Sequence, residues 1–191
     1  MPQSSSTQSA RATTDLGFIS DVTLRRKLVE AIETTSALYL VQQDPNYSGI
    51  AKEIRRIIVL YCASIIEAVF LYLYKRNGFK LTKLEYRDVQ TLTQRYQLDS
   101  NCKFVIASQV DIPRHERELM LDLLLKLFVD ENIISKQLGD KIEKAKSIRN
   151  TLHLAKSRSG LIIGQSGVKT AIDAVYETII VVRNHLTNRI T

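Results

Sequence analysis

The sequence contains few of the residues that break helices or crosslink a chain. It has 7 glycines and 3 prolines among 191 residues, which argues against collagen-like, linker-rich and turn-dense all-β architectures. Its 2 cysteines, Cys62 and Cys102, cannot build a disulfide framework, and the lack of a CxxC pair argues against a structural zinc site. Hydrophobic residues make up 45% of the chain, which is too many for a disordered protein.

The common catalytic motifs are missing as well. The sequence has no GxxxxGK[ST], GxGxxG, GxSxG or HExxH. Residues 164–167 (GQSG) place glycines beside an expected helix start, where an anion could bind. No lysine follows at P-loop spacing, so an ordinary turn explains this segment better. We therefore expect no metal and no cofactor.

The N-terminal segment and the most apolar segment bear on localisation. Residues 1–15 are rich in Ser, Thr and Gln and lack an apolar face, which predicts a disordered tail rather than a secretory signal. Residues 57–74 are nearly long enough to span a membrane. However, Glu67 lies in their middle, where a carboxylate would be costly in a bilayer. We therefore expect a cytoplasmic protein with no membrane contact.

Residues 57–74 are better explained as part of a long central helix that other helices bury. Gly78 is well placed to end this helix. An earlier helix is predicted over 21–43, with Asp21 as its N-cap. Glu67 should have a Lys, Arg or Tyr partner, with Arg149 among the candidates, because an isolated buried charge is costly.

The chain from residue 82 onward also carries mainly helix signals. Thr82-Lys-Leu-Glu85 fits a capping box and predicts a helix to about Leu98. Residues 99–112 have no clear pattern, and 104–107 could form a short strand or an irregular packed segment. Asp111 and Pro113 are then expected to start a further helix that runs through the apolar residues 119–128.

Three more helices are expected after this point. They are a short one over 131–138, one that begins at Gly139–Asp140 and runs to Lys156, and an amphipathic one over about 167–188. Together these patterns predict an all-α fold, a bundle of five to seven helices with a long central hydrophobic helix. We expect residues 16–191 to form a single domain.

Positive charge is concentrated in one segment. The net charge is +7, and residues 141–160 hold six Lys or Arg side chains against one acid, Glu143. A basic segment of this kind favours an anionic partner. The alternative is a solvated helix face with no partner.

Arg149 and His153 stand within this basic segment. They are four residues apart, so on a helix they lie about 40° apart around the axis, at the edge of the apolar stripe. A histidine there could deprotonate an RNA 2′-hydroxyl or protonate a leaving 5′-oxygen. The arginine could stabilise the negative charge of the phosphorane-like transition state, and Asn150 could orient the histidine or bind phosphate. The alternative is that the pair only caps carbonyls at a helix end.

At these residues the sequence resembles the HEPN superfamily. Arg149-Asn150 followed by His153 near the end of a helix is similar to the family's Arg-polar-…-His motif, and one last amphipathic helix follows it. Upstream, Ser64-Ile-Ile-Glu67 in a long apolar helix resembles an earlier helix of the family's bundle. Three residues separate Arg149 from His153, fewer than the family motif usually has, which bears on cleavage more than on the fold.

The resemblance implies an RNA-binding homodimer in which two motifs face a shared basic cleft. It also implies metal-independent endoribonuclease activity in a toxin–antitoxin or defence setting, with an antitoxin or other protein as a further partner. Arg149, Asn150 and His153 would then be catalytic, and Lys146, Lys156 and Arg158 would hold the RNA backbone. Two alternatives stay open. One is an RNA-binding domain that does not cleave, and the other is a helical adaptor in which Arg149 and His153 are structural.

Overall fold

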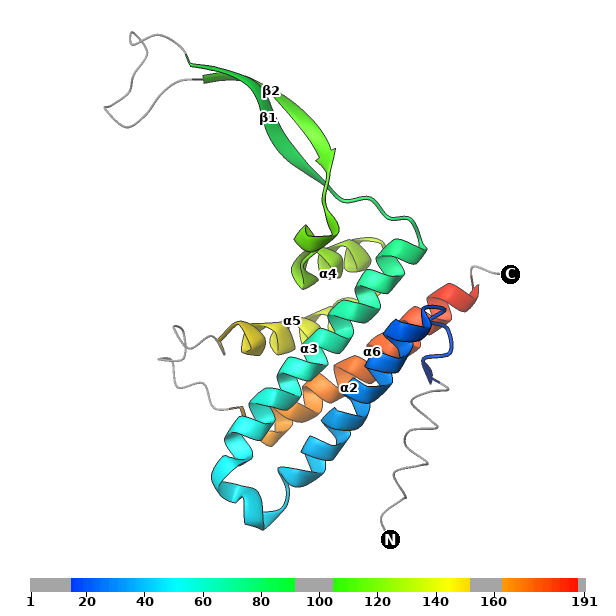
Figure 1. Ribbon diagram of the computed structural model, residues 1–191, viewed down its shortest axis with the longest axis vertical. Helices are drawn as coiled ribbons and strands as arrows, with labels where there is room; N and C mark the ends of the chain where they lie inside the picture. Colours follow the sequence, from blue (N-terminus) through cyan, green and yellow to red (C-terminus); the bar gives the residue numbers. More distant parts are fainter. Residues whose placement is uncertain (1–14, 92–104, 152–162, 189–191) are drawn as a thin grey trace. The chain divides into compact units, whose positions relative to one another are not determined.

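The structure, a computed structural model, describes residues 15–91, 105–151 and 163–188, without the side chains of residues 91, 150 and 151 (Figure 1). The described residues form two compact units. We call residues up to Asn77 and from Met120 the helical unit, and Gly78–Leu119 the hairpin unit. The elements are α2 (Val22–Val41), η1 (Pro45–Ile50), α3 (Ala51–Arg76), β1 (Thr82–Thr91), β2 (Val105–Pro113), η3 (Glu116–Glu118), α4 (Leu121–Asp130), α5 (Lys136–Thr151) and α6 (Gln165–Asn188).

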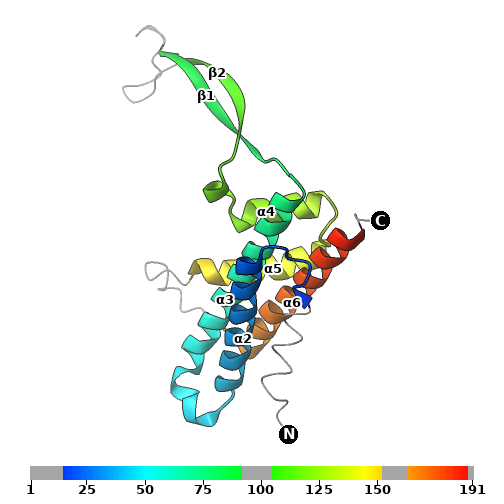
Figure 2. The ribbon, with the colours of Figure 1, turned by 45° about the vertical axis from the view of Figure 1, so that its right-hand side comes forward.

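Helix α3 is the centre of the helical unit. Helices α2, α4, α5 and α6 all pack against it, and Figures 1 and 2 show α2, α3 and α6 running alongside one another. Its buried side chains are Ala51, Ile54, Ile58, Val59, Cys62, Ala63, Ile65, Ile66, Val69, Phe70 and Leu73. Phe70 meets Phe128 of α4 edge to face, with 5.0 Å between the ring centroids. Each large apolar side chain buried in this way contributes about 1.5–3 kcal/mol, and the predicted central helix is confirmed.

One described helical segment, Pro45–Arg76, has the length and apolar composition to cross a membrane. Within its most apolar stretch, 61% is already buried by the rest of the protein. The core helix of a bundle meets the same criterion, so the segment is weak evidence for a membrane span.

Local sequence signals predicted two of the helix ends correctly. The Asp21 carboxylate accepts a hydrogen bond from the backbone N–H of Leu24 and caps α2, as predicted. Gly78 has a φ of 66° directly after α3, in the left-handed region that glycine occupies without strain. Of the predicted tail, only Asp15 lies within the described residues, and its carboxylate accepts from Arg183 of α6 at 3.0 Å.

The expected short helix over 131–138 is wrong. Residue Asn132 has a φ of 55°, which interrupts any helix there. Helix α5 instead begins at Lys136, before the expected start at Gly139–Asp140. The Ser135 hydroxyl accepts a hydrogen bond from the N–H of Leu138 and so satisfies one donor of the first turn.

The fold is mostly helical rather than all-α. The described part of the expected helix over 82–98 is strand β1, which pairs antiparallel with β2 from Thr82 opposite Pro113 to Thr91 opposite Val105. Lys83, Glu85 and Arg87 alternate with Leu84 and Tyr86, and this period of two belongs to a strand. The helix expected from Asp111 and Pro113 is likewise the end of β2, and α4 begins at Leu121.

Substituting Gly78 tests the end of α3. We expect Gly78→Ala to lower the free energy of unfolding by about 1 kcal/mol, because alanine is strained at positive φ. Gly49→Ala is the matched control, since an added Cβ meets no atom within 4 Å at either glycine and only Gly78 has a positive φ. Urea denaturation followed by circular dichroism measures both variants. Equal stability of the two would contradict the assignment.

Candidate functional site

Arg149 lies in the last turn of α5 and is joined to Glu67 in the middle of α3. Its Nη1 donates to Glu67 Oε2 at 2.7 Å, between residues 82 apart in the sequence. The arginine side chain is 36% exposed and the glutamate side chain 27%. The pair therefore stands at the surface of the bundle and is not sealed inside it.

Both charges of the Glu67–Arg149 pair are stabilised by their surroundings in the helical unit. Glu67 is the carboxylate of an otherwise apolar helix segment, and a partly buried carboxylate without a partner would be costly. A charge-assisted hydrogen bond to a guanidinium offsets that cost. Arg149 gains further because a cation in the last turn of a helix interacts favourably with the helix dipole. The expected Lys, Arg or Tyr partner of Glu67 is thus Arg149.

The guanidinium keeps capacity for a second partner. Arginine carries five N–H donors in a planar fork, and the bond to Glu67 uses one of them. More than a third of the side chain stays exposed. Arg149 is therefore bonded to Glu67 through one of its donors and remains partly exposed.

The other predicted catalytic residues are described less fully. Asn150 lies in the last turn of α5, but its side chain is not described. His153, Lys156 and Arg158 fall within 152–162, outside the described residues. Of the expected Arg–His pair, the structure therefore describes Arg149 and its partner Glu67, but not the histidine.

Lys146 has two acidic partners. Its Nζ lies 2.7 Å from Glu143 Oε2 and 3.1 Å from Asp122 Oδ1 of α4, and its side chain is only 12% exposed. Burial acts to lower the pKa of Lys146, but the hydrogen bonds to Glu143 and Asp122 outweigh it, so the pKa is raised. A lysine neutralised in this way ties α5 to α4 and is poorly placed to hold an RNA backbone.

Other cations of α5 are paired with carboxylates as well. Lys141 pairs with Glu177 of α6, so three cations of this helix join it to three other helices. Lys144 is exposed, and within the described part of the chain it has no ion pair. The sequence could identify the cations of this segment but not the partners on other helices, which are Glu177, Asp122 and Glu67.

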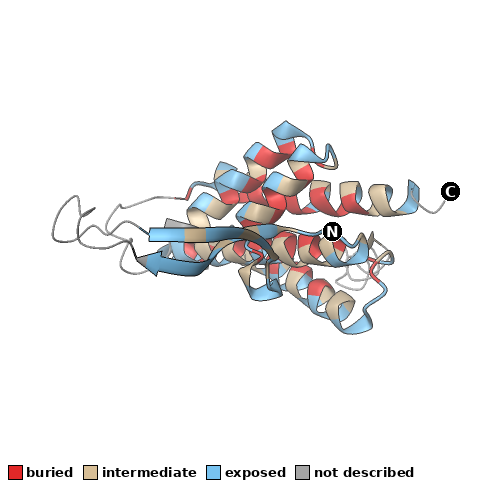
Figure 3. Cartoon of the chain, turned by 90° about the horizontal axis from the view of Figure 1, so that it is seen from above, coloured by how far each residue is buried: buried red, intermediate tan, exposed pale blue. Residues whose placement is uncertain are grey.

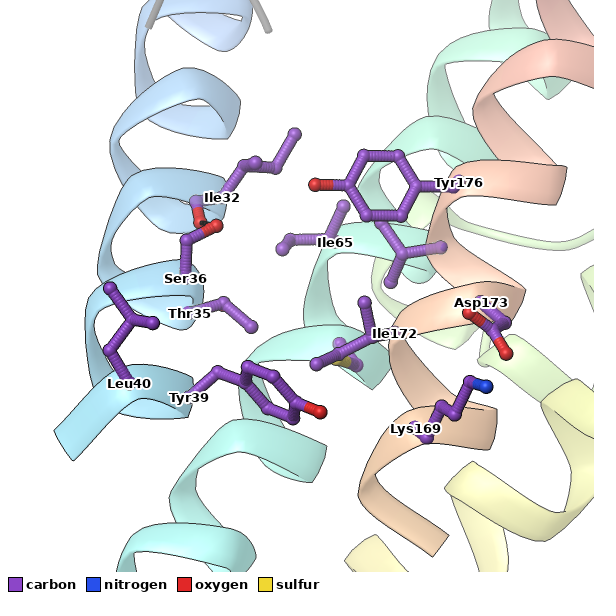
Figure 4. Close-up of a pocket in the computed structure, with 12 residues that line it drawn as sticks. Ile32, Thr35, Ser36, Tyr39, Leu40, Ile65, Lys169, Ile172, Asp173 and Tyr176 are labelled. Atoms are coloured by element: carbon purple, nitrogen blue, oxygen red, sulfur yellow. Dashed lines mark hydrogen bonds between the residues drawn. The ribbon is translucent and has the colours of Figure 1, made fainter. Parts of the chain in front are cut away.

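A second site lies between α2 and α6, over α3 (Figure 4). It is an apolar groove of about 400 Å³. Its lining residues are Ile32, Thr35, Ser36, Tyr39, Leu40, Cys62, Ile65, Lys169, Ile172, Asp173, Val175 and Tyr176. Tyr39 and Tyr176 extend into it from opposite walls. Neither Arg149 nor Glu67 lines it, and no pattern in the sequence separates its residues from ordinary core positions.

The reactive side chains of the described residues offer little further chemistry. Burial raises the pKa of the Cys62 thiol, in the floor of the groove, from 9.0 to about 12, so the thiol stays neutral near pH 7. Between residues 15 and 188, outside the undescribed stretches, no three His, Cys, Asp or Glu side chains gather as a metal site would require. The His185 ring lies 3.1 Å from the Asn77 amide nitrogen. The Glu67–Arg149 pair is therefore the strongest candidate site.

A double-mutant cycle tests whether this pair joins α5 to α3. We expect the coupling between Glu67→Ala and Arg149→Ala to be about 1 kcal/mol in the free energy of unfolding, because both groups are partly desolvated. Arg26 and Glu30 form the matched control pair on α2, with side chains 64% and 57% exposed. For that pair we expect about 0.3 kcal/mol. A coupling at Glu67–Arg149 no larger than the control would contradict a structural bond.

Comparisons with known proteins add no further constraint. No protein-family model, no curated protein and no solved structure matches this chain. Statements about function therefore rest on the residues and on their geometry.

Proposed function

We propose that this protein is a HEPN-like RNA-binding protein that cleaves RNA without a metal ion, in a toxin–antitoxin or defence role. One observation carries the proposal. The Arg149 guanidinium is oriented by Glu67 and partly exposed at the end of α5. Asn150 is the next residue in the sequence, and His153 is four residues after Arg149.

The chemistry assigns roles to three residues. Arg149 donates to the non-bridging oxygens of the scissile phosphate and stabilises the charge that builds up as the 2′-oxygen attacks. His153 takes the 2′-hydroxyl proton or gives a proton to the leaving 5′-oxygen, and water serves as the other proton acceptor or donor. The expected products are a 2′,3′-cyclic phosphate and a 5′-hydroxyl end. Asn150 supports the histidine or the phosphate.

Glu67 is a positioning residue in this scheme. Holding a flexible arginine in one rotamer before RNA arrives removes part of the entropy cost of ordering it. The acid also weakens the field that Arg149 presents to a phosphate, so its benefit is one of orientation. Replacing Glu67 should therefore change cleavage less than replacing Arg149.

The alternative function is a helical adaptor in which Arg149 is structural. The observation that favours it is the pairing of Lys141, Lys146 and Arg149 with carboxylates on three other helices. On that reading the charge of α5 holds the bundle together, and no RNA surface is needed.

Cleavage of RNA in EDTA separates these two functions. We expect the wild type to cleave, and both Arg149→Ala and His153→Ala to lose about 100-fold or more of the rate, as removal of a catalytic group typically does. Arg26→Ala is the matched control, because Arg26 is also an arginine paired with a glutamate on a helix surface. It should keep the full rate.

The variants must be shown to fold, by circular dichroism and thermal unfolding. Equal cleavage by Arg149→Ala and Arg26→Ala would overturn the catalytic role. Salt-sensitive RNA binding without cleavage by the wild type would reduce the proposal to RNA binding. If the folded wild type neither binds nor cleaves RNA, the result favours the adaptor function.

A further inference from the structure

The hairpin unit lacks a hydrophobic core of its own. Among its described residues only Leu119 is buried, and Figure 3 shows both strands coloured mainly as exposed. Its exposed large apolar side chains are Leu84, Tyr86, Val89, Val105 and Ile106. Two strands alone are marginally stable in water, and a third strand or a covered face is normally needed. Pairing with an additional strand would therefore stabilise the hairpin unit.

The edge of β1 is where such a partner can bind. In the described residues the sheet contains β1 and β2 only, so each strand has one edge without a partner strand. At the start of β1 the Thr82 carbonyl accepts a hydrogen bond from Arg114 Nε at 3.1 Å, which a carbonyl can keep while it accepts a second one. From Thr82 to Arg87 the ladder with β2 is regular, and the bulge that follows contains Asp88 with a φ of 53°. The regular segment is the part of β1 that can accept another strand.

The charges on this segment select its partner. Lys83, Glu85 and Arg87 alternate in sign along one face, and Thr82, Leu84 and Tyr86 form the other face. A second β1, placed antiparallel with Leu84 on the twofold axis, puts Lys83 of each copy opposite Glu85 of the other. The same register puts Leu84 opposite Leu84, and Tyr86 opposite Thr82. Opposite charges and apolar groups facing across strands stabilise a sheet.

The neighbouring registers fit less well. A twofold axis at Glu85 would place Glu85 opposite itself and Lys83 opposite Arg87, which is unfavourable. An axis at Tyr86 would bring the bulge at Asp88 within two residues of the centre from both sides. The edge of β2 has a single charged residue, Asp111, and ends in Pro113, so it offers no charge pattern to fix a register.

We propose that the β1 edge pairs antiparallel with β1 of a second copy of this chain, with Leu84 on the twofold axis, to form a four-stranded sheet. The pairs already present do not prevent it. Lys83 bonds Glu118 within the chain, but both side chains stay about a third exposed, and Glu85 meets Arg87 only at 3.5 Å. A strand-to-strand contact of this size is small, so the association is weak and concentration-dependent. It involves none of the residues of the proposed RNA site.

Disulfide crosslinking tests the register. In a Cys102→Ser background, Leu84→Cys places two thiols directly opposite one another, within the Cα separation that a disulfide allows. Tyr86→Cys is the matched control, because it lies on the same strand and face with 64% exposure against 58% for Leu84. We expect Leu84→Cys to form a covalent dimer about tenfold faster or more. Equal rates, a faster Tyr86→Cys, or no dimer from either variant would overturn the proposal.

Charge reversal tests the pairs beside the axis. The variants Lys83→Glu, Glu85→Lys and their combination are made in a Glu118→Gln background, so that residue 118 neither attracts nor repels residue 83. In sedimentation equilibrium we expect each single reversal to weaken dimerisation about tenfold, and the combination to restore it. A combined variant as weak as the singles would overturn the register. If the parent protein stays monomeric at millimolar concentration, pairing with a second copy is ruled out, and the β1 edge would have to bind a strand of another protein.

Discussion

The burial of α3 is the constraint on which the rest of the structure depends. Eleven of its side chains are buried, and four other helices pack against it. A partly buried carboxylate on so apolar a helix is costly without a cationic partner. Glu67 therefore selects Arg149, from 82 residues further along the chain. This bond joins the last turn of α5 to α3 at the surface of the bundle, and it orients Arg149.

Much of the helical unit could be predicted because its signals are local. The apolar spacing of α2, α3 and α6, the cap at Asp21 and the glycine at Gly78 are all readable within a few residues. The hairpin unit could not be predicted in this way. Thr82 to Glu85 imitates a helix cap, and the strand that pairs with β1 begins only at Val105.

The candidate site could be predicted only in part, for a related reason. Arg149 stood out by its place in the motif, and it was one of several candidate partners for Glu67 because a pairing across 82 residues leaves no local trace. Lys146 was expected to hold the RNA backbone, yet it is paired with Glu143 and with Asp122, which is 24 residues earlier in the chain. Composition thus overstates the phosphate-binding charge of α5, and tertiary ion pairs decide how much of it is available.

The central claim is that Arg149, while bonded to Glu67, still contacts a phosphate of bound RNA. Its most direct test is the equilibrium RNA affinity of the wild type and of Arg149→Ala, measured over a series of NaCl concentrations. One lost phosphate contact should lower the slope of log K against log salt concentration by about one. The account predicts that decrease together with weaker binding by the variant. Identical slopes and affinities would contradict it and would assign Arg149 to the bundle alone.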